Sequence, residues 1–496
     1  MANKKLWLGI LVIVFAMAAC GDEPDPDPDP YTPPQSEPGA SASNPIDRVV
    51  ENTNLGTMTS SASGWRQLLN SINSTGKYIN LDLSACTMTG TSFNPDSSVE
   101  TGKKYIVSII LPNAATDIEA GASSGATYES SFKYFNNLKS ISGANIITIG
   151  DYSFWCLYND TDPKNIQSVD FPRATTVGRA AFYGPNLQSI NFPQVTTIGN
   201  SAFSSCGFKN ASFPLVQSIG ETAFSSCSYL ESISFPASVQ LGYSSSSGTY
   251  SNPFTGCRNL TSFTVSGSGS LSVIENGKAL VRDGTILLAY PSASGTITMN
   301  NITALDGKAF GSCNLDSVNF PQVTSIGSET FASCSNIQDV SFPQVTNISS
   351  SAFSYCSRLQ SASFPLVTTI GSSAFFSCSA LVSVSIPMVT NIGALAFRST
   401  GATALSITMG SAAPSLGYNM FDNVRTAKTV RVKVPTGATG YSPFSSSSVT
   451  VSGTNTDANW ANGFRGGSWN GTTWASTTSG GTAAINQNIT VIIERQ

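Results

Sequence analysis

The stretch from Ile337 to Arg358 reads IQDVSFPQVTNISSSAFSYCSR, and variants of it recur along the chain. The copy before it reads LDSVNFPQVTSIGSETFASCSN, and the copy after it reads LQSASFPLVTTIGSSAFFSCSA. A Phe-Pro pair, or Ile-Pro in the last copy, returns every 21 or 22 residues within two blocks, at Phe171, Phe192, Phe213 and Phe235, then Phe320, Phe342, Phe364 and Ile386. A repeat of this period is typical of a solenoid, in which each coil packs only against its neighbours.

Apolar residues hold fixed positions in the repeat. Ile337, Val340 and Phe342 follow the L-x-x-L-x-L spacing of a leucine-rich-repeat strand, which turns alternate side chains inward. The proline after Phe342 cannot donate to a sheet ladder and is expected to end the strand. In most copies a glycine such as Gly371 follows the position that Ile348 holds in the quoted copy. We expect this glycine to permit a backbone bend. The pattern predicts a mainly β leucine-rich-repeat solenoid with coils of 21–22 residues.

The repeat resembles the BspA-like family of bacterial surface leucine-rich repeats, with I-G-x-x-A-F-x-x-C as its most specific part. The resemblance covers roughly residues 136–424 and is interrupted near 271–301. Gly277 and the Asp283-Gly284 pair predict turns of a hairpin insertion in that interruption. The resemblance implies a non-enzymatic adhesion protein that binds host matrix proteins or other cells.

The segments on either side of the repeats are expected to cap the solenoid, because its first and last coils would otherwise expose apolar surface. Residues 45–135 predict a small α/β N-terminal cap, with a helix near Trp65 and strands at 78–83 and 105–111. Residues 425–496 predict a β-rich C-terminal cap, with strands at 429–434 and 489–493.

The first 20 residues read as a secretory signal peptide. Lys4 and Lys5 precede an apolar run at 6–19, whose 14 residues are too few to cross a hydrocarbon core of roughly 30 Å. Met17-Ala18-Ala19-Cys20 resembles a bacterial lipobox, which implies that Cys20 becomes the lipidated first residue of the mature chain. The alternative is an ordinary signal peptide in which Cys20 is incidental.

Residues 21–44 are rich in proline and aspartate and predict a disordered, extended linker. The linker begins with Gly21-Asp22-Glu23, which resembles the surface-export signals of some Gram-negative lipoproteins. We therefore expect a protein on the bacterial cell surface, lipid-anchored to the outer membrane.

The composition excludes several classes of function. Charged residues make up 11% of the 496 residues and the formal net charge is -4, so no basic face for nucleic acid is expected. Histidine is absent, which removes Ser-His and Cys-His nucleophiles and His-ligated zinc. We expect no cofactor, no metal and no catalytic site. A hydrolase with an unrecognised carboxylate pair is the remaining enzymatic alternative.

Six cysteines share one phase of successive coils: Cys206, Cys227, Cys313, Cys334, Cys356 and Cys378. One reading is a ladder of disulfides or metal sites. The other is a column of small buried side chains, since a free cysteine packs as an apolar residue. The long spacing excludes C-x-x-C motifs and favours the buried column.

Two surfaces are candidates for binding. The first is the outward face of the predicted strands, which is almost uncharged and suits a protein or a glycan, although these residues could also serve only solubility. Its residues are Gln167, Asp170, Gln188, Asn191, Asp316, Asn319, Gln338, Ser341, Gln360 and Ser363. The second is a Gly-rich loop with Trp460, Trp469 and Trp474, whose rings either stack on sugars or cover the last coil. The alternative function is a glycan-capturing surface lipoprotein of a nutrient-uptake system.

Overall fold

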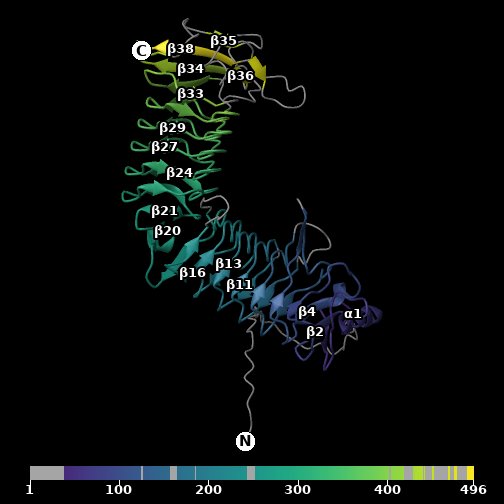
Figure 1. Ribbon diagram of the computed structural model, residues 1–496. Helices are drawn as coiled ribbons and strands as arrows, with labels where there is room; N and C mark the ends of the chain where they lie inside the picture. Colours follow the sequence, from purple (N-terminus) through teal and green to yellow (C-terminus); the bar gives the residue numbers. More distant parts are fainter. Residues whose placement is uncertain are drawn as a thin grey trace, which may run out of the picture.

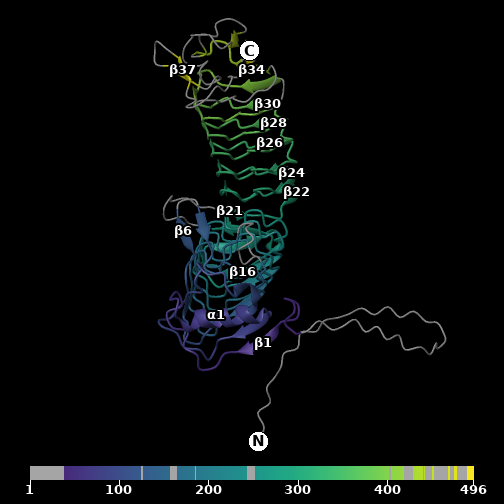
Figure 2. The same cartoon turned by 90° about the vertical axis from the view of Figure 1, so that its right-hand side faces the viewer.

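The computed structural model describes residues 38–124, 127–156, 165–184, 186–242, 252–400, 404–417, 428–439, 441, 449–451, 467–469, 474–476 and 489–496. Stacked coils form two arms that meet at a bend (Figures 1 and 2). The N-terminal arm runs from helix α1 (Gly64–Thr75) to the bend, and the C-terminal arm runs from the bend to the C-terminus. The solenoid predicted from the repeat is therefore confirmed.

Each coil contributes one strand to a row that we call the front strands. Among the described residues these strands fall into four sheets. The first holds β1 (Ile46–Val49), β2 (Ile79–Asp82), β4 (Ile106–Ile110), β8 (Ser140–Ser142), β10 (Ser168–Asp170) and β12 (Ser189–Asn191). The second holds β14 (Asn210–Ser212), β16 (Ser232–Pro236) and β18 (Ser262–Ser266), and the third β22 (Ser294–Thr298) and β24 (Asn314–Asn319). The fourth holds β26 (Asp339–Ser341), β28 (Ser361–Ser363), β30 (Ser383–Ser385), β32 (Ala404–Thr408), β34 (Lys428–Val434), β38 (Ile489–Arg495) and β35 (Val449–Val451).

A second row, the back strands, closes the other side of the coils. One sheet holds β3 (Ser92–Phe93), β5 (Asp117–Ile118), β9 (Thr148–Ile149), β11 (Thr176–Val177), β13 (Thr197–Ile198), β15 (Ser218–Ile219) and β17 (Gln240–Leu241). The other holds β19 (Leu271–Ile274), β20 (Ala279–Arg282), β21 (Ile286–Ala289), β23 (Ala304–Leu305), β25 (Ser325–Ile326), β27 (Asn347–Ile348), β29 (Thr369–Ile370), β31 (Asn391–Ile392) and β33 (Ser415–Leu416). Two hairpins stand apart, β6 (Ala122–Ser124) with β7 (Thr127–Glu129) and β36 (Gly467–Trp469) with β37 (Trp474–Ser476). Short 3-10 helices occupy Lys103–Tyr105 and Glu275–Gly277.

The repeat positions place two columns of phenylalanine rings between the rows. In the column after the front strands, the Phe342 ring lies 5.8 Å from Phe364 with an interplanar angle of 3°. In the Ala-Phe column, the Phe353 ring lies 5.4 Å from Phe375 with an angle of 2°. Each of these rings is fully buried, and burying one contributes roughly 1.5–3 kcal/mol. The columns therefore hold neighbouring coils in register.

The glycine of the repeat has a different role from the predicted bend. The backbone of Gly371 does not have a positive φ angle. A Cβ atom at Gly371 would lie 2.5 Å from the backbone nitrogen of Ser350 in the preceding coil. Glycine at position 371 therefore avoids a steric clash between two coils that approach closely, and it does not serve a positive φ angle.

The N-terminal segment continues the solenoid despite having no sequence repeat. Helix α1 is present as predicted and buries Trp65, Leu68, Leu69 and Ile72. Strand β1 pairs in parallel with β2, β2 with β4, and β4 with the repeat strand β8. Residues 38–44 also differ from the expected disordered linker, because the Gly39 carbonyl accepts a hydrogen bond of 2.8 Å from the Tyr78 amide. Ordered structure thus begins before residue 45.

The C-terminal strands extend the last front sheet. Strand β34 pairs in parallel with β32 and β38, and β35 pairs antiparallel to β38. Arg431 and Glu494 on adjacent strands form an ion pair of 2.6 Å. No helix among the described residues is both long enough and apolar enough to cross a bilayer.

The bend between the arms contains the hairpin insertion. Strands β19, β20 and β21 are successively antiparallel, and β21 then pairs in parallel with β23 of the C-terminal arm. Alternate residues of β20 enter different cores: Leu280 packs in the core of the N-terminal arm, whereas Ala279 and Val281 pack in the core of the C-terminal arm. The insertion is thus a layer shared by both arms.

Candidate binding face

The predicted face residues of the N-terminal arm lie side by side on neighbouring strands. Strands β10 and β12 pair in parallel, with Ser168 opposite Ser189 and Asp170 opposite Asn191. Gln167 and Gln188 precede these strands, and all four predicted residues are exposed. The Asn191 Nδ2 donates a hydrogen bond of 2.7 Å to the Asp170 Oδ1.

The predicted face residues of the C-terminal arm form a separate group. Strands β26 and β28 pair with Ser341 opposite Ser363. Gln338, Ser341 and Gln360 are exposed and Ser363 is half-buried. Asp316 and Asn319 are exposed on β24, which belongs to another sheet.

The front strands therefore do not form a single continuous sheet. In the described part of the chain, no ladder joins β12 to β14, β18 to β22, or β24 to β26. The hairpin insertion accounts for the second break, since it separates β18 from β22 in the chain. The ten predicted residues are divided between the two arms as a consequence.

Hydrogen bonds between coils fix many side chains of the front strands. Asn80 donates to Asp47 over 2.9 Å, and Ser108 donates to Asn80 over 2.9 Å. Farther along, the Thr296 and Ser317 hydroxyls lie 2.9 Å apart. Because such side chains are already ordered, less conformational entropy is lost when a partner binds them.

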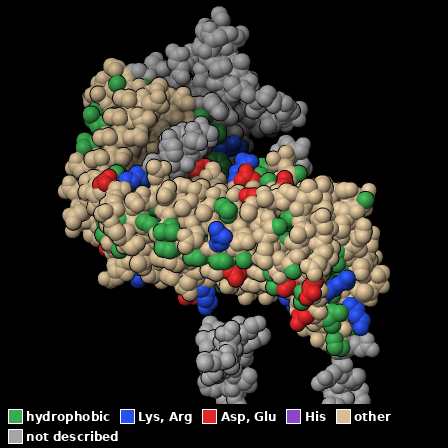
Figure 3. Space-filling model, turned by 60° about the horizontal axis from the view of Figure 1, so that its bottom comes forward, with side chains coloured by type: hydrophobic (Ala, Val, Ile, Leu, Met, Phe, Trp, Pro, Cys, Tyr) green, Lys and Arg blue, Asp and Glu red, His purple; other side chains and the backbone are tan. Residues whose placement is uncertain are grey.

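The surface carries little charge. Figure 3 shows one side of the molecule on which uncharged polar groups and backbone predominate, with scattered acidic and basic side chains. This matches the content of 11% charged residues. A surface of this kind favours hydrogen-bonding partners over polyanions.

The cysteine column consists of buried free thiols. The nine cysteines of the described residues form no disulfide, and each is buried. The Cys334 Sγ donates to the Phe310 carbonyl over 3.1 Å, and Cys356 does the same to Phe331. Among the residues that the structure covers, no group of three or more His, Cys, Asp or Glu side chains is placed to hold a metal. The buried-thiol interpretation is confirmed for these residues.

Burial also lowers the reactivity of two thiols of the column, Cys313 and Cys378. It raises the pKa of Cys313 and of Cys378 to about 12. For both thiols the largest cause is the desolvation of the thiolate in the apolar core. At pH 8 a thiol with this pKa is ionised in only about one molecule in ten thousand, and the thiolate is the reactive form.

We expect native protein to resist alkylation for that reason. Iodoacetamide at pH 8, followed by intact-mass measurement, should leave the column cysteines unlabelled in buffer and label them after unfolding in guanidinium. Labelling of Cys356 in native protein at the rate of the unfolded chain would contradict the buried column.

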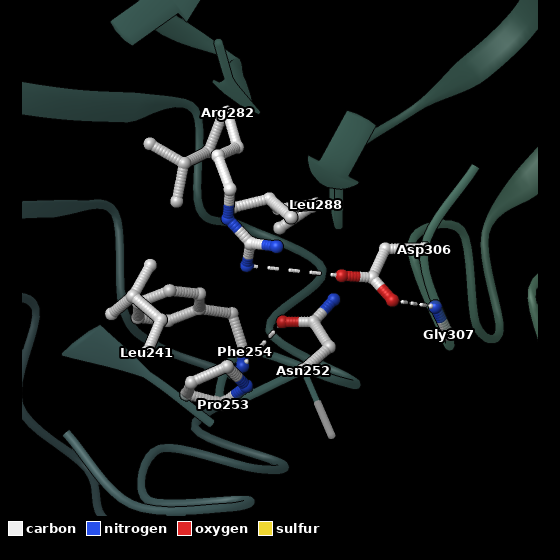
Figure 4. A pocket seen from close by; sticks show the side chains of 10 residues that line it. Leu241, Asn252, Pro253, Phe254, Arg282, Leu288, Asp306 and Gly307 are labelled. Atoms are coloured by element: carbon white, nitrogen blue, oxygen red, sulfur yellow. Dashed lines mark hydrogen bonds and ion pairs between the residues drawn. The ribbon is translucent and has the colours of Figure 1, made fainter. Parts of the chain in front are cut away.

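A small cavity lies at the bend (Figure 4). Leu241 and Phe254 from the N-terminal arm line it together with Arg282 of β20 and Asp306 of the C-terminal arm. The Arg282 guanidinium lies 4.0 Å from the Asp306 carboxylate, and burial raises the pKa of that carboxyl group. The contacts join the two arms, and they resemble a structural junction more than a ligand site.

The remaining predicted residues are only partly described. Cys20 and Trp460 lie outside the described residues. Trp469 and Trp474 stand opposite each other in the β36–β37 hairpin.

Sequence reasoning missed two hollows beside the break between β12 and β14. Ile190 and Asn210 line both of them, and Tyr229 lines one. No spacing in the sequence marks this break, because Phe208 follows Phe203 by five residues just as Leu187 follows Phe182 in the preceding coil, whose strand β12 still pairs with β10.

Comparison with known proteins identifies the repeats. Residues 158–277 and 303–428 match the family model described as the BspA type leucine rich repeat region, in 6 copies. No curated protein matches the sequence.

Solved leucine-rich repeat structures are similar at low identity. A protein from Eubacterium ventriosum is 19% identical, with 64% of this chain and 84% of that chain covered and a TM-score of 0.42. A protein from Bacteroides ovatus is 21% identical, with 70% and 83% covered and a TM-score of 0.36. A leucine rich cell surface protein from Faecalibacterium prausnitzii is 20% identical, with 62% and 83% covered and a TM-score of 0.36.

The repeat phase, the parallel front and back strands and the family match agree on one architecture. Its coarse function is that of a repeat-based binding scaffold. The solenoid of this protein belongs to the BspA-type leucine-rich repeat family.

Proposed function

We propose that this protein is a non-enzymatic, surface-anchored adhesion protein whose front strands bind host matrix proteins or other cells. The observation that carries the proposal is the exposed, nearly uncharged group of side chains on β10 and β12, held in place between coils. Such a group offers many hydrogen bonds without the large cost of removing water from charges.

The arrangement suits weak binding that is repeated many times. A single group of mostly uncharged side chains contributes modest affinity, but many copies on one cell bind together, and avidity then raises the overall strength by about 100-fold or more. The anchor that this requires is supported by the sequence alone, through the lipobox-like residues ending at Cys20 and the Pro/Asp-rich residues that follow.

A front-strand substitution tests the proposal. In Gln167→Arg, a long charged side chain replaces an exposed amide beside β10, and binding of residues 38–496 to immobilised collagen, laminin or fibronectin should fall about tenfold. Surface plasmon resonance measures the change. Gln217→Arg is the matched control, because Gln217 is exposed beside the back strand β15 and should leave binding unchanged.

Equal binding by Gln167→Arg and Gln217→Arg would show that the front strands are not the binding face. Absence of binding to matrix proteins and to intact cells would reject adhesion altogether.

Glycan capture for a nutrient-uptake system is the second candidate. The register that sets Trp469 opposite Trp474 favours it, because two aromatic residues then occupy facing positions of one hairpin. Binding of soluble polysaccharide that is lost in Trp469→Ala, with matrix binding retained, would support this alternative.

A further inference from the structure

A hollow on the N-terminal arm draws on three successive coils. Asn186 and Gln188 come from the coil of β12, Gly207 and Asn210 from the coil of β14, and Tyr229 from the coil of β16. We call it the Tyr229 hollow. It holds about 1150 Å³ of empty space, part of it open to solvent.

The interrupted ladder creates this space. The Gly207 amide still donates to the Leu187 carbonyl over 2.9 Å, but no strand pairing follows between β12 and β14 in the described residues. Ile190, whose equivalents in neighbouring coils are buried, is left half-buried at the break. The hollow therefore has an apolar floor beside polar walls.

Because Gly207 has no side chain, its backbone lies close to the side chain of Asn186 in the preceding coil. A Cβ atom at Gly207 would lie 2.8 Å from the Asn186 Oδ1. Any larger residue would displace the Asn186 amide, so the position of that amide depends on the glycine.

The polar groups of the wall are mostly amides. Asn186, Gln188 and Asn210 are all exposed. The Asn210 Oδ1 accepts a hydrogen bond of 2.6 Å from the Ser232 hydroxyl, which leaves its NH₂ group as a donor. An amide side chain both donates and accepts, and this matches adjacent hydroxyl groups, which do the same.

An exposed ring stands at the edge of the same hollow. Tyr229 is 60% exposed, and its ring offers an apolar face together with a hydroxyl group that can hydrogen-bond. Its flat face can cover the apolar C–H face of a sugar ring while the amides bind the hydroxyl groups.

The lining of the hollow carries one charge, which is paired with a neighbouring carboxylate. Lys209 is the charged residue among those lining it, and its Nζ lies 3.2 Å from the Glu231 Oε1. An anionic ligand would have to compete with Glu231 for that ammonium group. The lining therefore favours a neutral ligand.

We propose that the Tyr229 hollow binds a neutral sugar unit of a glycan, with Tyr229 as the stacking ring and Asn186, Gln188 and Asn210 as hydrogen-bonding groups. The site is separate from the Trp469–Trp474 hairpin, and it does not depend on adhesion to matrix proteins.

A glycan array tests the proposal with residues 38–496 of the protein. The array carries neutral oligosaccharides ending in mannose, galactose, glucose or N-acetylglucosamine, and sialylated versions of the same chains. We expect binding to at least one neutral glycan. Tyr229→Ala should weaken this binding about tenfold or more, as should Gly207→Ala through the displaced Asn186 amide.

Tyr355→Ala is the matched control, because Tyr355 is 55% exposed in the C-terminal arm, away from the hollow. It should bind the glycan like the unchanged protein, and all variants should keep its melting temperature. Three results would overturn the proposal: no binding to any neutral glycan, binding only to sialylated chains, or equal binding by Tyr229→Ala. Matrix binding that persists in those cases would leave the adhesion proposal standing.

Discussion

Replacing Phe342 with aspartate is expected to destabilise the C-terminal arm by at least about 4 kcal/mol. The ring is fully buried and stacks between Phe320 at 6.3 Å and Phe364 at 5.8 Å. Truncating a buried phenylalanine costs about 3–5 kcal/mol. The carboxylate adds the further cost of an unpaired charge in an apolar core, so the two effects act in the same direction.

Guanidinium unfolding monitored by circular dichroism measures this change. Because each coil contacts mainly its neighbours, the loss should be concentrated in the coils around Phe342, and hydrogen exchange should accelerate there first. Ser341→Asp is the matched control, since it places the same charge on the exposed neighbour, and it should change stability by less than about 0.5 kcal/mol. A melting temperature for Phe342→Asp equal to that of Ser341→Asp would show that the inward phase is wrong.

Cys20→Ala is expected to release the protein from the membrane almost completely. The lipobox-like sequence makes Cys20 the proposed attachment point for lipid. Each buried methylene of an acyl chain contributes about 0.8 kcal/mol to membrane binding, and more than one chain is needed for stable anchoring. Removing the attachment point therefore removes the whole of this contribution.

Fractionation of cells that express the full chain, followed by immunoblotting, measures the release. Cys86→Ala is the control, because it also removes one cysteine but leaves Cys20 in place, and it should remain with the membrane. If Cys20→Ala stays in the membrane fraction in the same amount, lipid anchoring at Cys20 is refuted.

The core of each coil was predictable from the sequence because it repeats. Ile337, Val340 and Phe342 were assigned inward from their spacing, and all three are buried. A side chain that recurs at the same phase in successive coils must meet its own copies, so periodicity alone determines which residues stack. The same reasoning placed Cys334 and Cys356 in a buried column.

Features without a repeat were harder to predict. Strands β1, β2 and β4 extend the sheet of the repeats, yet their residues share no period with them. The role of Gly371 depends on how near the preceding coil lies, and a sequence does not give that distance. In both cases the decisive contact depends on backbone positions that the pattern of residues does not give.

The sequence predicted which residues of the candidate site are exposed, but not how the strands that carry them are arranged. The exposed phase of Gln167 and Asn191 was correct, since alternation along a strand fixes it. The break between β12 and β14 was not foreseen, because Phe182 to Leu187 and Phe203 to Phe208 have the same spacing, yet the strand that follows Leu187 pairs with the preceding coil and the strand that follows Phe208 does not. The sequence therefore did not predict Tyr229 as part of a binding site.

The repeats of the two arms and the hairpin insertion at the bend are expected to tolerate different changes in sequence. Coils can be gained or lost within either arm by duplication or deletion of one repeat, since such an event leaves Leu280 and Val281 on their own sides of β20. The length of each arm would then vary between relatives, while the bend between the arms stays the same. A shift of one residue within β20 would instead turn Leu280 toward the core of the C-terminal arm and Val281 toward the core of the N-terminal arm. The hairpin therefore tolerates substitution by similar apolar residues but not insertion.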